Sequence, residues 1–183
     1  MSELPKGWAK ANLLALCQPK QWKVISTAEL TEAGYVVYGA NGKIGFYSTY
    51  THEHPTLMIT CRGATCGNLH VSEPRSYING NAMALDNLAE QATSIGYLRY
   101  ALLARGLTDA ITGTAQPQIT RQSLSDITIK LAPLAEQTRI AANARRTAGP
   151  GQYPESPHRR HPHAAQTLSP VRPRRCRFWA VDG

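Results

Sequence analysis

Long hydrophobic runs are missing from this sequence. None of its 183 residues lies in an apolar stretch approaching the roughly 20 residues that a membrane-spanning helix needs. The first ten residues, MSELPKGWAK, also lack the apolar core that follows the basic start of a secretory signal. We therefore predict a cytoplasmic protein with no membrane partner.

Cysteine is scarce and irregularly spaced. The four cysteines are too few for a disulfide framework in a chain of this size, which fits a reducing compartment. Two of them combine with three histidines into a candidate ligand set, namely His52, His54, Cys61, Cys66 and His70. Zinc needs about four such ligands converging, usually in tight pairs, and this spacing matches no common zinc motif. We therefore predict small core cysteines and no metal, and a metal-dependent enzyme is the third-ranked alternative.

Familiar catalytic motifs are also absent. The chain has no Gly-x-Ser-x-Gly, no His-Glu-x-x-His and no Asn-Pro-Pro-Tyr, and its acidic residues are scattered rather than paired near a lysine as a nuclease requires. The stretch GANGKIG lacks the spacing of a phosphate-binding loop, and a predicted strand follows it instead of a helix. We predict a protein that is not an enzyme and has no cofactor.

Positive charge is plentiful but unevenly placed. Of the net charge of +8, a net +6 lies between Ala144 and Gly183, which leaves only +2 on residues 1–143. The same last forty residues hold six of the 12 prolines and show no apolar periodicity. A segment of this composition buries little apolar surface. We therefore predict that residues 144–183 form a disordered Pro/Arg-rich tail.

Residues up to Tyr47 contain clear local signals. A Pro-Lys-Gly turn precedes a short apolar stretch that predicts one or two turns of helix within residues 4–18. WKVIS at 22–26 has strand composition, and TAELTEAG at 27–34 predicts a short helix with Thr27 and Gly34 as caps. YVVYGANGKIGFYS predicts a β-hairpin with a tight turn at Asn41-Gly42.

The remaining residues of the body alternate between strand and helix patterns. TLMITCRG at 56–63 predicts a buried strand, and NLHVS and SYING predict shorter ones. Apolar residues recur at helical spacing from Leu88 to Arg105, and Gly106 closes this pattern as a C-cap. DITIKL at 126–131 predicts a strand, and Pro133 opens a final helix.

Several segments together resemble a known family. They are LPKGW, VVYGANGKIGFYS, ITCRGATCGNLHVSEPRSYINGNAMAL, YLRYALL and ITGTAQPQITRQSLSDITIKLAPLAEQTRIA. They are similar to the target recognition domain of the DNA-specificity subunit of type I restriction-modification systems. The last segment is the most specific: Gly-x-x-Gln-Pro-Gln-Ile, a short polar helix, a strand, and Pro-Leu-x-Glu-Gln-x-x-Ile opening a long helix. The likeness covers residues 4 to about 143.

The resemblance implies a fold and a division of the chain. We expect an α+β fold: one mixed α/β recognition domain at 1–132 with a twisted, mostly antiparallel sheet and hairpins, then the start of a spacer helix at 133–143. The helical pattern fails after Asn143, and reading the codons from Ala144 one nucleotide later can restore a helix of the expected kind. We therefore interpret residues 144–183, including the histidine-rich ESPHRRHPH, as an out-of-frame translation.

The resemblance also implies a function. Each recognition domain of that family reads one half of a split double-stranded DNA target, and the spacer helix docks the methyltransferase subunits and, through them, the restriction subunit. The expected function is therefore sequence-specific DNA binding that directs methylation and cleavage to a half-site. The alternative is a non-functional or regulatory remnant that binds a second recognition domain or a methyltransferase subunit, and the low body charge favours it slightly.

Polar and basic residues on predicted turns are the candidates for contact with DNA, because base edges and phosphates are bound by such side chains. Surface lysines are usually just solvated, however, and Tyr47 or Tyr50 could instead cover the core. The candidates are Lys20, Gln21, Lys43, Tyr47, Ser48, Thr49, Tyr50, Thr51, Arg62, Gln116, Gln118 and Arg121.

Overall fold

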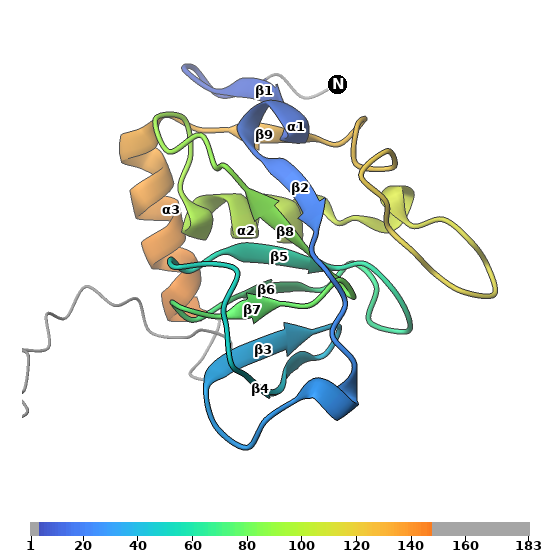
Figure 1. Ribbon diagram of the computed structural model, residues 1–183. Coiled ribbons are helices and arrows are strands. Elements are labelled where there is room, and N and C mark those ends of the chain that lie inside the picture. The colour runs from blue at the N-terminus through green and yellow to red at the C-terminus, as the bar shows by residue number, and fades with distance from the viewer. Residues whose placement is uncertain (1–3, 148–183) are drawn as a thin grey trace, which may run out of the picture.

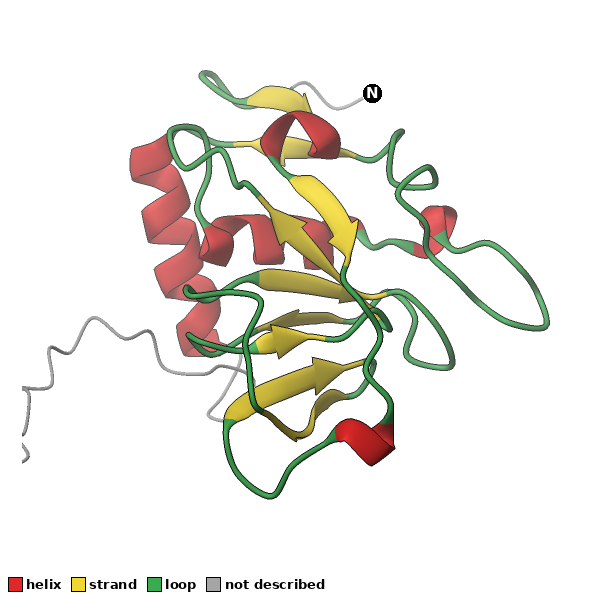
Figure 2. Cartoon of the chain, viewed as in Figure 1, coloured by secondary structure: helices red, strands yellow, loops and turns green. Residues whose placement is uncertain are grey.

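The computed structural model describes residues 4–147, which form a layered arrangement of sheets and helices (Figures 1 and 2). A four-stranded sheet lies in the middle. Helix α2 (Ile95–Arg105) packs on one of its faces, and a three-stranded sheet packs on the other. Helix α3 (Leu134–Thr147) stands at one end of these layers (Figure 1). The expected α+β class with mostly antiparallel strands is confirmed, and the strands are divided among three sheets.

The two ends of the described chain meet in a small two-stranded sheet. Strand β1 (Ala9–Asn12) pairs antiparallel with β9 (Thr128–Leu131). One turn of helix, α1 (Leu13–Leu16), follows β1, and the Asn12 side chain caps it by accepting a hydrogen bond from the Leu14 backbone at 2.8 Å. The predicted short helix and the predicted strand near residue 130 are therefore both present.

The central sheet has the strand order β2-β8-β5-β6, with all neighbours antiparallel. Its strands are β2 (Gln18–Gln21), β8 (Ala82–Asp86), β5 (Leu57–Thr60) and β6 (Leu69–Val71). Strand β5 is buried on both faces, because Leu57 and Ile59 contact the helix layer while Met58 contacts the second sheet. The predicted buried strand is confirmed, whereas β8 was not predicted.

The three-stranded sheet contains the predicted hairpin. Strands β3 (Tyr35–Gly39) and β4 (Gly42–Tyr47) pair antiparallel, and β7 (Tyr77–Ile78) runs parallel to β3. Gly39 pairs with Gly42, so the two turn residues are Ala40 and Asn41. The turn lies one residue earlier than the sequence predicts, and Gly42, with φ of 92°, follows it in the left-handed region.

Two sequence predictions before the hairpin are wrong. Residues 22–26 are not a strand, because side chains rather than a neighbouring strand satisfy their carbonyls: Tyr77 donates to the Lys23 carbonyl, and Asn79 to that of Ile25. The predicted helix at 27–34 shrinks to one 3-10 turn, η1 (Thr27–Glu29). Its N-cap is Ser26 rather than Thr27, because Glu29 accepts hydrogen bonds from the Ser26 backbone and hydroxyl.

The helices differ from their predicted bounds mainly at their first residues. Helix α2 begins after Ser94, whose hydroxyl accepts from the Tyr97 backbone at 3.2 Å, rather than near Leu88; it ends at the predicted Gly106. A 3-10 turn, η2 (Thr108–Ala110), follows it. Residues 121–126 form successive turns instead of a short helix. Helix α3 runs to Thr147, so residues 144–147 are helical and the predicted start of the tail at residue 144 is wrong; the predictions for residues 148–183 lie outside the described residues.

Candidate nucleic-acid interface

Three loops meet at the end of the molecule opposite α3 (Figure 1). They are the β3-β4 turn with its flanks (39–43), the loop after β5 (61–68) and the loop after η2 (111–122), and we call their combined surface the loop face. The first two are joined by threonine hydroxyls. Thr60 donates to the Ala40 carbonyl at 2.6 Å, and Thr65 donates to the Asn41 side-chain oxygen at 2.7 Å.

Backbone hydrogen bonds join the second and third loops. The Ile119 N–H donates to the Cys61 carbonyl at 3.0 Å, and the Gly63 N–H donates to the Pro117 carbonyl at 3.2 Å. The third loop is closed on itself as well, since Thr112 and Gln118 exchange two backbone hydrogen bonds of 2.8 and 2.9 Å. These bonds make the loop face one connected surface rather than three independent loops.

Gln21, at the end of β2, fixes the base of this surface. Its side-chain amide donates to the Cys61 sulfur and to the Gly80 carbonyl, each at 3.0 Å. Burial raises the pKa of the Cys61 thiol, so the sulfur stays protonated near neutral pH. The amide group of Gln21 is thus engaged within the protein, where it positions the first residue of the loop after β5.

The loop face is positively charged. Its three segments contain Lys43, Arg62 and Arg121 and no aspartate or glutamate. The two arginines are exposed. Lys43 is exposed too, but its charge is paired: its ammonium lies 2.5 Å from the Glu73 carboxylate, and that hydrogen bond raises its pKa. The unopposed charge of the surface therefore comes from the two arginines.

Five of the candidate residues, 47–51, lie at the other end of β4. Tyr47 packs edge-on against Tyr77, with ring centroids 5.4 Å apart. Thr51 accepts a hydrogen bond from the Ile78 backbone at 3.0 Å. Tyr50 donates to the Glu53 carboxylate, which raises the pKa of the tyrosine. The structure does not bring this group, with its exposed neighbours Ser48 and Thr49, together with the loop face.

The other candidates lie nearer to the loop face. Gln116, Gln118 and Arg121 belong to its third segment and are exposed. Lys20 lies on β2 with its ammonium 3.7 Å above the Trp22 ring. Asn41 was missed as a candidate, because the Asn-Gly pair was interpreted only as a turn signal; its side chain is exposed at the hairpin tip.

Two of the five candidate metal ligands have polar partners elsewhere, whereas the buried Nε2 of His70 has no hydrogen-bond partner within the described residues. His52 contacts the Asp86 carboxylate at 2.9 Å through Nε2, and Cys61 accepts from Gln21. His70 is partly buried, and this burial lowers its pKa. Within residues 4–147 no three histidine, cysteine or acidic side chains converge as a metal site would require.

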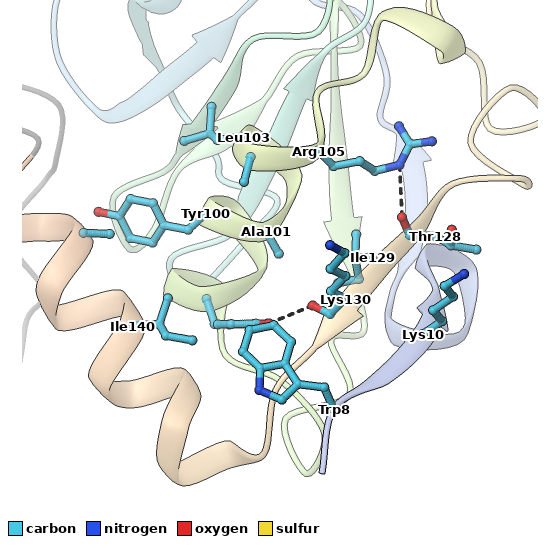
Figure 3. Close-up of a pocket in the computed structure, with 13 residues that line it drawn as sticks. Trp8, Lys10, Tyr100, Ala101, Leu103, Arg105, Thr128, Ile129, Lys130 and Ile140 are labelled. Carbon is cyan, nitrogen blue, oxygen red and sulfur yellow. Dashed lines mark hydrogen bonds between the residues drawn. The ribbon is translucent and has the colours of Figure 1, made fainter. Parts of the chain in front are cut away.

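A groove opens between helix α2, helix α3 and strand β9 (Figure 3). Its volume is about 830 Å³. Trp8 lies at its rim and donates to Glu136 of α3 at 3.0 Å, while Tyr97 donates to the Lys130 carbonyl at 2.7 Å. Tyr100, Leu103 and Ile140 give the groove an apolar lining.

None of the helices within residues 4–147 combines the length and the apolar character needed to cross a membrane.

Comparisons with known proteins agree on one family. Residues 5–143 match the type I restriction modification DNA specificity domain. The S subunit of a type I restriction-modification system from M. genitalium is similar over 79% of this chain and 40% of that one, with a TM-score of 0.67 and 18% identity. The HsdS subunit from Thermoanaerobacter tengcongensis is similar over 79% and 38%, with a TM-score of 0.57 and 19% identity.

A third similar structure is described as the structural basis underlying complex assembly and conformational transition of the type I R-M system; it has a TM-score of 0.63, 21% identity, and coverage of 80% of this chain and 39% of that one. A comparison with curated proteins finds no significant match. The chain thus spans about two fifths of the length of the structures that it matches. Because the family match covers well over half of the sequence, the chain belongs to the family of type I restriction-modification DNA specificity domains.

Proposed function

We propose that this chain binds double-stranded DNA sequence-specifically, as the specificity subunit or half-subunit of a type I restriction-modification complex. One observation carries the proposal: the loop face presents exposed arginine, glutamine and asparagine side chains on a hydrogen-bonded frame whose segments contain no carboxylate. These are the side chains that pair with base edges in the major groove. Arginine also binds phosphates, which supplies affinity without regard to sequence.

The proposed target is half of a split site. A single recognition domain is described, and it matches about two fifths of each similar structure. We place the domain at residues 1–132 and the spacer from residue 133 onward. Gln137 joins the two parts, because its buried amide donates to the Ala92 and Ala132 carbonyls, each at 2.8 Å, and so ties α3 to the domain. In this arrangement the methyltransferase subunit docks on α3, and the restriction subunit joins through it.

Selection from random duplexes tests the proposal. The full chain, mixed with the methyltransferase subunit of its own system, is incubated with a random-sequence duplex library at physiological salt, and the retained DNA is sequenced. We expect one short motif to be enriched, since each base contact discriminates by roughly 1–3 kcal/mol. Retention of DNA with no enriched motif would leave only non-specific phosphate binding and refute the proposal.

The groove beside α3 favours a second candidate, a remnant that acts only by binding protein. An apolar groove of this size is typical of a binding site, and Ile140 and Leu103 line it (Figure 3). Under this alternative, Ile140→Glu abolishes co-sedimentation with the methyltransferase subunit in the analytical ultracentrifuge. Arg62→Ala changes neither this co-sedimentation nor the DNA retained in the selection. An enriched DNA motif that requires Arg62 would exclude this alternative.

A further inference from the structure

Arg62 and Gln118 lie directly opposite each other across the second and third loops. They form an antiparallel bridge whose two hydrogen bonds join the residues on either side, Cys61 to Ile119 and Gly63 to Pro117. In such a non-hydrogen-bonded pair the Cα atoms approach to about 4.5 Å, and both side chains leave the backbone on the same face. The two side chains therefore start side by side from the backbone.

Neither side chain is used by the fold. Both residues are exposed, and within residues 4–147 neither side chain has a hydrogen bond or an ion pair. Gln21, Gln137 and Arg105, in contrast, bond to carbonyls or carboxylates of the protein. An arginine and a glutamine held together without intramolecular partners have their full hydrogen-bonding capacity available to a ligand.

Hydrogen bonds hold the backbone beneath this pair. Gln118 takes part in two isolated β-bridges, one to Arg62 and one to Thr112. Gln21 fixes Cys61, the residue before Arg62, through its hydrogen bonds to the sulfur and to the Gly80 carbonyl. The hydrogen-bonded base holds the two Cα atoms at a constant spacing, and base reading needs side chains that start from fixed positions, whereas phosphate binding does not.

We propose that Arg62 and Gln118 are the specificity-determining pair of this domain and read a guanine and an adenine in adjacent base pairs through the major groove. This inference rests on the proposed function. Arginine pairs with both acceptors of guanine, and glutamine pairs with the donor and acceptor of adenine. Successive bases are about 3.4 Å apart along a strand, a step that two side chains whose Cα atoms lie about 4.5 Å apart span by converging slightly.

Arg62→Lys separates base reading from phosphate binding. Lysine keeps the positive charge that a phosphate contact needs but loses the planar fork that grips both guanine acceptors. Gln118→Ala removes the adenine contact and leaves the charge unchanged. Matched controls lie at the opposite end of the sheets: Arg75→Lys, where the arginine pairs with Glu53, and Gln18→Ala, where the glutamine accepts from Asn87.

The experiment repeats the random-duplex selection with the full-length wild type and the four variants, after their melting temperatures are shown to agree. The wild-type motif is expected to contain a G·C pair beside an A·T pair. Arg62→Lys should lose the preference for guanine, and Gln118→Ala that for adenine. Each loss amounts to about fivefold to 150-fold in the ratio of affinities for the selected duplex and its single-base variant. The two controls should keep the wild-type motif.

Three results would overturn the inference. If the wild type enriches a motif without adjacent G·C and A·T pairs, the pair reads other bases. If Arg62→Lys and Gln118→Ala both enrich the wild-type motif, the pair does not determine specificity, although the proposed function stands. If the wild type enriches no motif, the proposed function and this inference fail together.

Discussion

Glutamine shows how one residue type takes different roles in this chain. Gln21 and Gln137 are bonded inside the protein, whereas Gln118 is exposed without an intramolecular partner in residues 4–147. Sequence alone does not separate these roles, because Gln21 bonds to Cys61 and Gln137 to Ala92, which lie 40 and 45 residues away. Sequence could therefore identify Gln118 as a candidate for DNA contact, but it could not show that Gln118 lies opposite Arg62.

Gln137 gives a prediction for stability. Its side chain is 1% exposed and satisfies two carbonyls of the domain. Gln137→Ala leaves both buried and unpaired, so we expect it to lower the free energy of unfolding by about 2–4 kcal/mol, measured in urea. Arg139 lies two residues further along, on the exposed side of α3. Arg139→Ala should change the free energy of unfolding by less than about 0.5 kcal/mol. Equal effects of the two substitutions would mean that Gln137 does not anchor the helix.

Cys17 gives a prediction for thiol reactivity. Burial, together with the Asp86 carboxylate, raises its pKa from 9.0 to about 12. Only the thiolate reacts with iodoacetamide, and at pH 8 a thiol of this pKa is almost wholly protonated. In the native protein we expect Cys17 to be alkylated at least tenfold more slowly than in urea, as followed by peptide mass spectrometry. Native Cys17 that reacts as fast as the unfolded chain would contradict the buried position.

At the scale of elements, local sequence patterns predicted helices and strands correctly where contacts between residues close in sequence decide the structure. The hairpin, the strands near 57–60 and 128–131, and the end of α2 at Gly106 all follow from residues close in sequence. Strand β8 was missed because its sequence, AMALD, has no β-branched residue, and pairing with β2 and β5 on both sides makes it a strand. The strand predicted at residues 22–26 is absent for the opposite reason, since side chains distant in sequence donate hydrogen bonds to the carbonyls of these residues.

Substitutions at two glycines are expected to change the stability of the protein in opposite directions. Gly42 has φ of 92° and an open space where a Cβ would lie, so Gly42→Ala costs only backbone strain, about 1–2 kcal/mol of hairpin stability. Gly96 is the second residue of α2, and a Cβ there would make ordinary contacts of 3.5 and 3.6 Å. Gly96→Ala should therefore stabilise the protein by about 0.5–1 kcal/mol. Melting curves that shift in the same direction for both would show that one of the two backbone conformations is wrong.

At the scale of the whole molecule, the loop face and α3 lie at opposite ends of the layers (Figure 1). The proposed DNA contact and the proposed subunit contact are therefore separated by the sheets. Sequence indicated the family and the two functional segments, but not this separation, which depends on how three sheets stack. It also could not show that the loop face is cross-linked by bonds from Thr60 and Thr65 to the hairpin turn.

The last 36 residues give a prediction about the whole chain. Residues 148–183 contain six arginines, so they add phosphate affinity that does not depend on base sequence. A chain ending at Thr147 should melt within about 2 °C of the full chain, since a Pro/Arg-rich segment buries little apolar surface. Its binding to random duplexes should also depend less steeply on salt. Unfolding of the shortened chain would contradict the claim that residues 148–183 contribute little to stability. An unchanged salt dependence would contradict the claim that they add phosphate affinity.

Hydrogen–deuterium exchange with and without bound DNA tests the central claim most directly. The full chain is saturated with the duplex that it selects, and amide exchange is followed by peptide mass spectrometry. We predict slower exchange in residues 61–68 and 111–122, around Arg62 and Gln118, with no change in α3 or in the groove beside it. Protection confined to α3 and the groove, with the loop face unchanged, would contradict the claim that this face reads DNA.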